Sequence, residues 1–485
     1  MKCSARELRE RVGPWKQSNG PLYRELADAI RSAVQQGHIA IDTVLPTERD
    51  VAATFDVSRT TVVSAYAELK NDGLLASRQG KGTWVATRTN TPGAIPVTAA
   101  DNHTTPMRTE GIEISLASSV PPPPPIVHEV LSERGIPLAP DDLQLGLPDR
   151  LGVRELREVL ARHLAGTGLQ AHPDQILITT GATQGIDLAV SACTRRGDLV
   201  LVEAATFPGV LALLRHRGRR VAGIPCDING VQPEALEEMI RQQRPALVYL
   251  VPTCQNPTGS ILATGRRQRI AQIIARTGTP LVEDLSLSDV VLRDSAIPAP
   301  IASHSPEAPI ISIGSANKPL WMGLRVGWMR LPDAWGEELL TTKTLADLGT
   351  PVLAQRLLLT LVPVLDQARA ETCKILNANM DATIEELAIR LPDWEASIPQ
   401  GGSNLWVRLP AARSDALVHA SLRQGLQLVS GRAFSPEKLC ADRLRLPFTL
   451  PPATMREAVR RLAQAWAEVR QLEPSATRVQ EMVVV

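Results

Sequence analysis

Cysteine is scarce in this sequence and scattered along it. Six cysteines are spread through 485 residues, and no two of them form a Cys-x-x-Cys pair. A disulfide framework needs paired cysteines in a small chain, and a structural zinc site needs closely spaced ligands. We therefore expect neither a disulfide scaffold nor a metal centre. Free thiols also suit a reducing compartment, so we expect a cytoplasmic protein.

Long apolar runs are missing as well. No segment approaches the roughly 20 apolar residues that a membrane-spanning helix needs, and the charged N-terminus lacks the apolar stretch of a secretory signal. We therefore expect no membrane partner. The net charge is +1, which neither favours nor excludes nucleic acid. Residues 1–88 hold 13 Lys and Arg against 10 Asp and Glu, and this mildly basic balance permits contact with a phosphate backbone.

Three short helical patterns occupy the N-terminal part. Residues 1–19 are polar and mixed, and we expect a flexible lead-in there. Apolar residues at a spacing of four predict a first helix over 21–37. Threonine and serine N-caps introduce two further helices, over 45–52 and 59–71. A glycine-rich turn between two apolar runs then predicts a hairpin. Together these elements predict a winged helix-turn-helix over residues 20–86.

The third predicted helix begins with Ser58-Arg59-Thr60-Thr61. A guanidinium and hydroxyls at a helix N-terminus suit phosphates and a major groove. The hairpin turn carries polar residues that could reach a minor groove or the backbone. The pattern from Leu45-Pro46-x-Glu48-Arg49 to Gly80-x-Gly82-Thr83 resembles the GntR family of bacterial repressors, which implies a double-stranded DNA operator as partner. The residues expected to face DNA are Arg49, Ser58, Arg59, Thr60, Thr61, Gln79, Gly80 and Lys81.

The rest of the chain has a different pattern. Residues 87–111 are rich in Thr, Ala and Pro and predict a linker. From 112 to 472, short apolar runs alternate with helical patterns, which predicts an α/β domain with a mostly parallel sheet and a smaller C-terminal subdomain. Residues 473–485 are expected to form a tail. The predicted strands of the large sheet are 176–180, 199–203, 246–251, 281–284, 310–314 and 326–331.

One stretch of this domain carries a candidate nucleophile. A buried-strand pattern over 310–314 leads through Ser315 to Lys318, and Arg325 follows seven residues later. A lysine among apolar neighbours has a lowered pKa, and its neutral amine can form a Schiff base with an aldehyde. The arginine and the serine hydroxyl could hold a phosphate dianion. A surface lysine followed by a structural arginine is the alternative interpretation.

Three upstream motifs weaken that alternative. They are Gly181-Ala182-Thr183-Gln184, which joins a strand to a helix, Asn256-Pro257-Thr258-Gly259, and Asp284 at the end of an apolar run. In this order, followed by the lysine and the arginine, they resemble the fold-type I aminotransferases, which use pyridoxal 5'-phosphate (PLP). The resemblance implies a PLP site with Lys318 as its catalytic amine.

The same resemblance assigns the other cofactor residues. Ala182 and Thr183 would offer backbone N–H groups to the phosphate, together with Ser315 and Arg325. Asp284 would face the pyridine nitrogen, Asn256 the 3'-oxygen, and Phe207 the ring face, although Phe207 could equally be a core residue. Arg445 would clamp a substrate or effector carboxylate, with Arg443 as the alternative.

Tyrosine is the residue that such a site lacks. Only Tyr23, Tyr66 and Tyr249 occur, and many relatives place a tyrosine where this chain has Ser286, and another where it has Leu145. Missing phenols should weaken polarisation of the cofactor. Efficient transamination is therefore less expected than PLP binding.

The winged helix and the aminotransferase-like domain together resemble the MocR subfamily of GntR regulators. That resemblance implies a head-to-tail homodimer that binds PLP and controls transcription, often of vitamin B6 or amino-acid metabolism genes. The effector would be an amino compound or PLP itself. Two alternatives stay open: a working aminotransferase with a vestigial DNA-binding domain, and a plain repressor without a cofactor.

Overall fold

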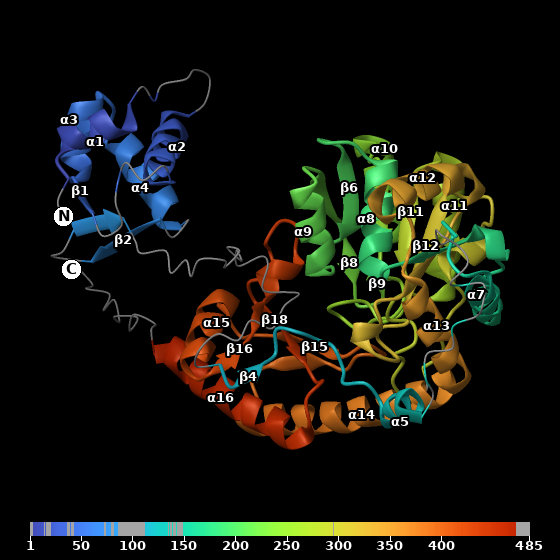
Figure 1. Ribbon diagram of the computed structural model, residues 1–485. Helices are drawn as coiled ribbons and strands as arrows, with labels where there is room; N and C mark the ends of the chain where they lie inside the picture. Colours follow the sequence, from blue (N-terminus) through green and yellow to red (C-terminus); the bar gives the residue numbers. More distant parts are fainter. Residues whose placement is uncertain are drawn as a thin grey trace, which may run out of the picture. The chain divides into compact units, whose positions relative to one another are not determined.

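The computed structural model divides the chain into two compact units, residues 1–96 and 97–485 (Figure 1). The predicted linker 87–111 and tail 473–485 lie outside the described residues, as do Gln79, Gly80 and Lys81 of the hairpin turn. The residues that the structure describes are 3–13, 15, 21–35, 39, 43–71, 74–78, 82–85, 112–133, 135, 138, 142, 149–293 and 295–471.

The first unit is a winged helix-turn-helix, as predicted. Its helices are α1 (Ala5–Val12), α2 (Leu22–Gln35), α3 (Glu48–Phe55) and α4 (Arg59–Asn71). A small antiparallel sheet has the order β1-β3-β2, with β1 (Val44–Leu45), β2 (Leu75–Arg78) and β3 (Gly82–Val85). The predicted cap at Thr47 is present, because its hydroxyl accepts a hydrogen bond from the Asp50 N–H. Ser58 caps α4 in the same way through the Thr61 N–H, at 3.0 Å.

Helix α1 corrects the prediction that residues 1–19 form a flexible lead-in. Ser4 and Glu7 form a capping box, in which each side chain accepts from the other residue's backbone N–H. Leu8 is fully buried in the core of this unit, and the Cys3 N–H donates to the Val44 carbonyl at 2.9 Å. The prediction failed because an eight-residue helix with one buried leucine leaves little apolar periodicity in the sequence.

The second unit contains a seven-stranded sheet with the order β5-β13-β12-β11-β10-β6-β7. Only β13 runs antiparallel to its neighbours, so the sheet is mostly parallel, as predicted. Six of its strands were predicted; β7 was not, because its side chains are only partly buried and arginine opens it. The strands are β5 (Ile176–Thr179), β6 (Leu199–Glu203), β7 (Arg220–Ile224), β10 (Leu247–Leu250), β11 (Leu281–Asp284), β12 (Ile310–Ser315) and β13 (Gly327–Arg330).

Helices cover both faces of this sheet (Figure 1). One core packs α8 (Ala182–Cys193), α9 (Pro208–His216) and α12 (Gly336–Asp347) against one face. The other core packs α7 (Arg154–Gly166), α10 (Pro233–Gln243), α11 (Thr264–Thr277) and α13 (Val352–Leu361) against the opposite face. This three-layer arrangement buries the strands on both sides, which is why they appear as continuous apolar runs in the sequence.

The C-terminal lobe is built on α14 (Leu365–Arg390), the long helix along the lower edge of Figure 1. A four-stranded antiparallel sheet has the order β14-β15-β18-β17 and packs with α15 (Ser414–Arg423) and α16 (Pro452–Gln471). Its strands are β14 (Glu395–Ser397), β15 (Asn404–Arg408), β17 (Val429–Ser430) and β18 (Arg443–Pro447). The predicted helical stretch near 341–391 is divided into α12, α13 and α14, and Leu348 takes a left-handed conformation at the first break.

The remaining elements are short. Helix α5 (Pro125–Glu133) packs on α14, and β4 (Ile114–Ser115) pairs in parallel with β16 (Leu426–Gln427) of the C-terminal lobe. Strands β8 (Cys226–Asp227) and β9 (Gly230–Val231) form a separate hairpin. In the described part of the chain no single helix is long and apolar enough to cross a membrane. Among the same described residues, one bent pair, Asp333–Asp347 with Val352–Arg390, reaches the required length and apolar composition when its two parts are taken together. The residues that the structure describes contain no cluster of His, Cys, Asp and Glu that could hold a metal ion.

Candidate functional site

The carboxyl ends of the parallel strands carry most of the predicted site. Parallel strands that end at one edge of an α/β sheet bring the residues after them together. Here that edge borders a cavity of about 160 Å³. All predicted cofactor residues and the predicted carboxylate clamp line it: Ala182, Thr183, Phe207, Asn256, Asp284, Ser315, Lys318, Arg325 and Arg445.

Lys318 lies just after β12 and is partly buried. Its amine donates a hydrogen bond to the Ser119 carbonyl at 3.2 Å. Burial and, to a smaller extent, the nearby Arg445 cation lower the pKa of this amine to about 8, while the Asp284 carboxylate acts in the opposite direction. At a pKa near 8, about a tenth of the amine is neutral at pH 7, far more than for an ordinary lysine. The neutral form is the one that acts as a nucleophile.

Asp284 ends β11 and is buried. The Tyr249 hydroxyl donates to its Oδ2 at 2.7 Å, and the Ser286 N–H donates to Oδ1 at 2.9 Å. The Ser286 hydroxyl also donates to Oδ1. Burial and the neighbouring carboxylate raise the pKa of Tyr249 well above its ordinary value, so the phenol remains a hydrogen-bond donor. These three hydrogen bonds fix the orientation of the Asp284 carboxylate.

Sequence reasoning missed the role of Tyr249. We noted it only as the third tyrosine, without a place in the site. It lies on β10 opposite Val282 of β11, two residues before Asp284. A tyrosine inside a predicted buried strand needs a partner for its hydroxyl, and the carboxylate on the adjacent strand was the available acceptor.

The N-terminus of α8 forms a small cradle beside Arg325. Gly181 precedes this helix with φ +78° and has no side chain to cap it. A Cβ on Gly181 would lie 2.8 Å from Arg325 Nη2, and a Cβ on Gly327 would lie 2.8 Å from the Ala182 nitrogen. Gly181 therefore lets the Arg325 guanidinium approach the N-terminus of α8, and Gly327 lets β13 approach the same helix end. A cation beside the N-terminus of a helix suits a phosphate.

Asn256 and Phe207 line the same cavity from two neighbouring loops. The Asn256 side-chain oxygen is buried and has no hydrogen-bond partner in the described part of the chain. Gln255, the preceding residue, donates to Glu203 at 3.0 Å and to the Ala205 carbonyl at 2.7 Å, so it ties the two loops together. Burial raises the pKa of Glu203 to about 8. Sequence reasoning did not identify this bridge.

Arg445 is buried on β18, whereas Arg443 is partly exposed and does not line the cavity. The Arg445 guanidinium donates to the Ala117 carbonyl and lies 5.0 Å from the centre of the Phe434 ring. Its Nε is buried without a hydrogen-bond partner among the described residues. Burial lowers the pKa of Arg445 to about 10, so it stays charged at neutral pH. A buried guanidinium without a carboxylate partner suits an anionic ligand group.

The segment before α5 also contributes to the site, which sequence reasoning missed. Residues 118–120 line the cavity, and the Ser119 carbonyl accepts from both Lys318 and Ser403, the latter at 2.8 Å. These contacts use backbone carbonyls, and a backbone contact leaves no signature in the side chains of the sequence. The pairing of β4 with β16 and the hydrogen bond from Arg445 to the Ala117 carbonyl also hold this segment beside the cavity.

The predicted DNA-facing residues lie around the start of α4. Ser58 contacts the hydroxyls of Thr60 and Thr61, both at 2.7 Å. Arg49 on α3 and Arg59 on α4 are exposed, as is Thr60, while Thr61 is partly buried. The exposed groups are available to a phosphate backbone or a groove. Gln79, Gly80 and Lys81 belong to the same prediction but lie outside the described residues.

The residues of the cavity fit PLP. The space beside α8 and Arg325 suits its phosphate, the Asp284 carboxylate its ring nitrogen, and the Lys318 amine its aldehyde. The Nε of Arg445, unpartnered among the described residues, marks a position where a bound anion would supply the missing acceptor.

Comparison with known proteins agrees with both units. Residues 134–462 match the family described as aminotransferase class I and II, and residues 22–85 match bacterial regulatory proteins of the gntR family. The chain is 28% identical to the HTH-type transcriptional regulator YisV of Bacillus subtilis, over 82% of this chain and 87% of that protein. It is 27% identical to the "Probable rhizopine catabolism regulatory protein MocR" of Rhizobium meliloti, over 64% of this chain and 66% of that protein.

Aminotransferases are similar to the second unit. The 2-aminoadipate transaminase of Thermus thermophilus is 31% identical over 60% of this chain and 75% of that enzyme. The solved structure of the Pyrococcus horikoshii kynurenine aminotransferase has a TM-score of 0.68 at 28% identity, over 76% of this chain and 93% of that chain. The chain therefore belongs to the aminotransferase class I and II family and carries a GntR-type regulatory domain in front of it, an architecture consistent with the MocR subfamily of GntR transcriptional regulators.

Proposed function

We propose that this regulator binds its DNA operator in a manner controlled by the occupant of the cofactor cavity. One observation carries the proposal: the Lys318 amine, the Asp284 carboxylate and the Arg445 guanidinium line a single cavity that fits PLP and one further carboxylate. PLP supplies an electron-withdrawing ring once it is bound. The chain supplies the groups that hold it, and the effector is an amino compound or PLP itself. The controlled genes would be those of vitamin B6 or amino-acid metabolism.

Each predicted residue has a role in this proposal. Lys318 would bind the aldehyde, and Asp284 would hold the proton on the ring nitrogen. Ser315, Arg325 and the first N–H groups of α8 hold the phosphate. Asn256 donates to the 3'-oxygen, and Phe207 covers one ring face. Arg445 orients the carboxylate of an amino compound, which makes occupancy of the cavity dependent on the metabolite present.

The DNA-facing side of the proposal rests on the start of α4. Arg49, Ser58, Arg59, Thr60 and Thr61 would meet the operator, together with the hairpin turn at Gln79, Gly80 and Lys81. A head-to-tail homodimer would present two such helices to paired half-sites. Three exposed leucines near the break between α12 and α13 support dimerisation, because a cluster of exposed apolar side chains marks a contact surface. Leu345, Leu348 and Leu353 are 84%, 59% and 52% exposed.

A working aminotransferase is the second candidate function. It is favoured by the complete set of Lys318, Asp284 and Arg445, since these three groups are also what transamination needs. Ser286 weakens the case for an aminotransferase. Its hydroxyl donates to Asp284, whereas many relatives have a tyrosine at this position whose phenol reaches the cofactor. Single-turnover absorbance with a panel of amino acids separates the two functions. Rapid conversion to pyridoxamine phosphate without specific DNA binding would favour the enzyme.

Operator binding with and without PLP tests the regulator directly. The DNA upstream of the gene is mapped and titrated with the full chain, first without cofactor, then with PLP and with amino compounds. We expect PLP or an amino compound to change the affinity for the operator. In Lys318→Ala this response should disappear, while Lys374→Ala, which changes an exposed lysine of α14, should keep it. Equal operator affinity under all conditions would contradict ligand control.

A further inference from the structure

A second and larger cavity lies behind the loop that carries Asp284. Its volume is about 660 Å³, within the range of small-molecule sites. Consecutive residues of this loop face different cavities: Asp284, Ser286 and Leu287 line the cofactor cavity, whereas Leu285, Ser288 and Asp289 line the second one. One short segment thus forms a wall of both cavities.

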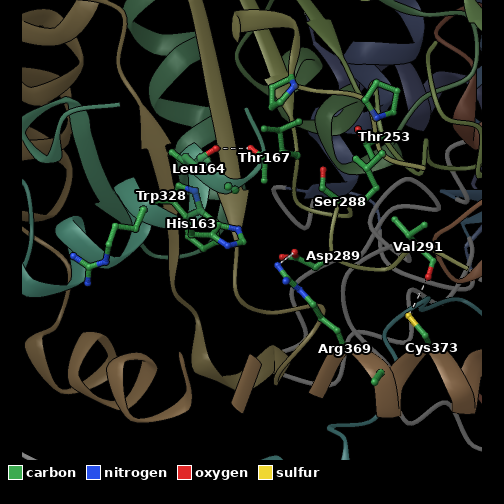
Figure 2. A pocket seen from close by; sticks show the side chains of 18 of the residues that line it. His163, Leu164, Thr167, Thr253, Ser288, Asp289, Val291, Trp328, Arg369 and Cys373 are labelled. Carbon is green, nitrogen blue, oxygen red and sulfur yellow. Dashed lines mark hydrogen bonds and ion pairs between the residues drawn. The ribbon is translucent and has the colours of Figure 1, made fainter. Parts of the chain in front are cut away.

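The walls of the second cavity combine apolar surface with a few polar groups. Figure 2 shows His163 and Trp328 on one side, facing Asp289 and Arg369 on the other. The two rings pack edge to face at 6.1 Å. Ile297, which also lines the cavity, is 49% exposed. An apolar wall with few polar groups suits an organic molecule with an apolar body.

The charges around this cavity favour an anion. Four arginines line it against one carboxylate, Asp289, which is paired with Arg369. Arg369 also pairs with Asp366, and Arg293 pairs with Asp381, whereas Arg162 and Arg267 form no ion pair among the described residues. Arg267 is fully buried and donates to the Leu262 and Pro252 carbonyls, each at 2.7 Å. No carboxylate among the described residues forms an ion pair with it. The buried Glu283 carboxylate interacts with Arg267 without forming an ion pair, and the hydrogen bonds of Arg267 go to neutral oxygens. Its positive charge therefore favours an anion in the adjacent space.

Two hydrogen-bonding groups in the wall, unpaired in the described part of the chain, indicate that the ligand carries a hydrogen-bond acceptor. The Ser288 hydroxyl and the Arg369 Nε are buried and have no partner among the described residues. Buried polar groups are nearly always paired, so such exceptions call for a missing partner. Rotation about one bond turns the Ser288 hydroxyl, and a carboxylate could accept from it and from Arg369.

We propose that this cavity binds a small carboxylate with an apolar body, and that its binding is coupled to the cofactor cavity. The coupling follows from the shared loop. Asp289 ties the loop to Arg369 of α14, and the Cys373 thiol of the same helix donates to the Val291 carbonyl at 3.1 Å (Figure 2). A carboxylate that takes Arg369 from Asp289 releases one end of the segment whose other end positions Asp284 through Ser286.

Calorimetry on the PLP-loaded full chain tests this proposal, with benzoate as the probe and benzamide as its neutral counterpart. Arg445→Met serves as the background, because it removes the carboxylate clamp of the cofactor cavity. We expect benzoate to bind at least about tenfold more tightly than benzamide. Ala370→Trp should abolish benzoate binding, because this exposed alanine of α14 lines the cavity.

Ala378→Trp is the matched control, since it places the same side chain at an exposed alanine of the same helix that does not line the cavity. Ile297→Trp narrows the cavity from the opposite wall and provides a second blocking variant. Binding that survives both blocking variants, or no binding of benzoate in the Arg445→Met background, would overturn the proposal. Coupling requires that benzoate change the affinity for PLP in the unblocked protein and that Ala370→Trp remove the change.

Discussion

At the scale of single residues, the most informative group is the amine of Lys318. Its pKa is lowered from 10.5 to about 8 by burial first and by Arg445 second. Below that pH the amine is protonated and cannot attack an aldehyde, and above it the neutral form dominates. Capture of PLP should therefore become faster as the pH rises through about 8 and then level off.

The variant Arg445→Met tests whether the Arg445 cation lowers the pKa of Lys318. Removing the guanidinium removes a cation near the amine, so the pKa of Lys318 should rise and the rate profile should move to higher pH. Stopped-flow absorbance of PLP capture between pH 6.5 and 10, at roughly half-unit steps, gives both profiles. Identical profiles for the two proteins would show that Arg445 does not influence the amine.

Residues differ in how far the sequence reveals them. That Lys318, Asp284 and Arg325 line one cavity was predictable, because Asp284 ends a buried strand and the other two lie between the next two strands, in an order typical of one cofactor. Tyr249 and Ser119 were not, since one acts across neighbouring strands and the other through a backbone carbonyl. The assignment between Arg443 and Arg445 also needed the structure, because strand alternation places both on the same face and only depth distinguishes them.

At the scale of elements, the N-terminus of α8 depends on Gly181. Gly181→Ala would place a methyl group 2.8 Å from Arg325 Nη2 at a positive φ of 78°. We expect it to weaken PLP binding by at least about tenfold, because it fills the proposed phosphate cradle. The readout is the PLP dissociation constant from titration of the cofactor-free protein.

Gly197→Ala is the control for backbone strain. Gly197 also has a positive φ, of 90°, but a Cβ there meets nothing within 4 Å. It should lower stability without changing PLP affinity. Equal losses of affinity in the two variants would show that strain alone, and not a filled cradle, explains the effect.

Helix α1 offers a second test at this scale. Ser4→Ala removes the capping box and should destabilise the first unit by about 0.5–2 kcal/mol. Hydrogen exchange of the full chain should show faster exchange in α1 with unchanged protection in α8. The control Ser64→Ala, at an exposed position within α4, should leave hydrogen exchange in α1 unchanged. The capping pair Ser4 and Glu7 was visible in the sequence; what hid the helix was its single buried leucine.

At the scale of the whole molecule, the alternation of strands and helices was enough to predict a mostly parallel sheet and a smaller C-terminal lobe. The break between α12 and α13 was not predicted, although Gly349 and Pro351 follow Leu348 and are the residues that commonly end a helix. The exposed leucines at that break are the surface on which the proposed dimer depends.

A charge on this surface should therefore prevent dimerisation. Leu348→Asp places a carboxylate among the exposed leucines, which would have to be desolvated in an interface. Sedimentation should show a shift from dimer to monomer. Leu439→Asp is the control, since Leu439 is 73% exposed but belongs to the C-terminal lobe. A variant Leu348→Asp that sediments like the unmodified chain would exclude this surface from the dimer.

Covalent capture by Lys318 is the step on which PLP control of the operator depends. Borohydride reduction of the PLP-loaded chain, followed by peptide mass mapping, identifies the lysine that carries the cofactor. We expect a single phosphopyridoxyl group on the peptide containing Lys318. A label on Lys343, Lys374 or any other lysine, or no label at all, would contradict the assignment of this cavity as the cofactor site.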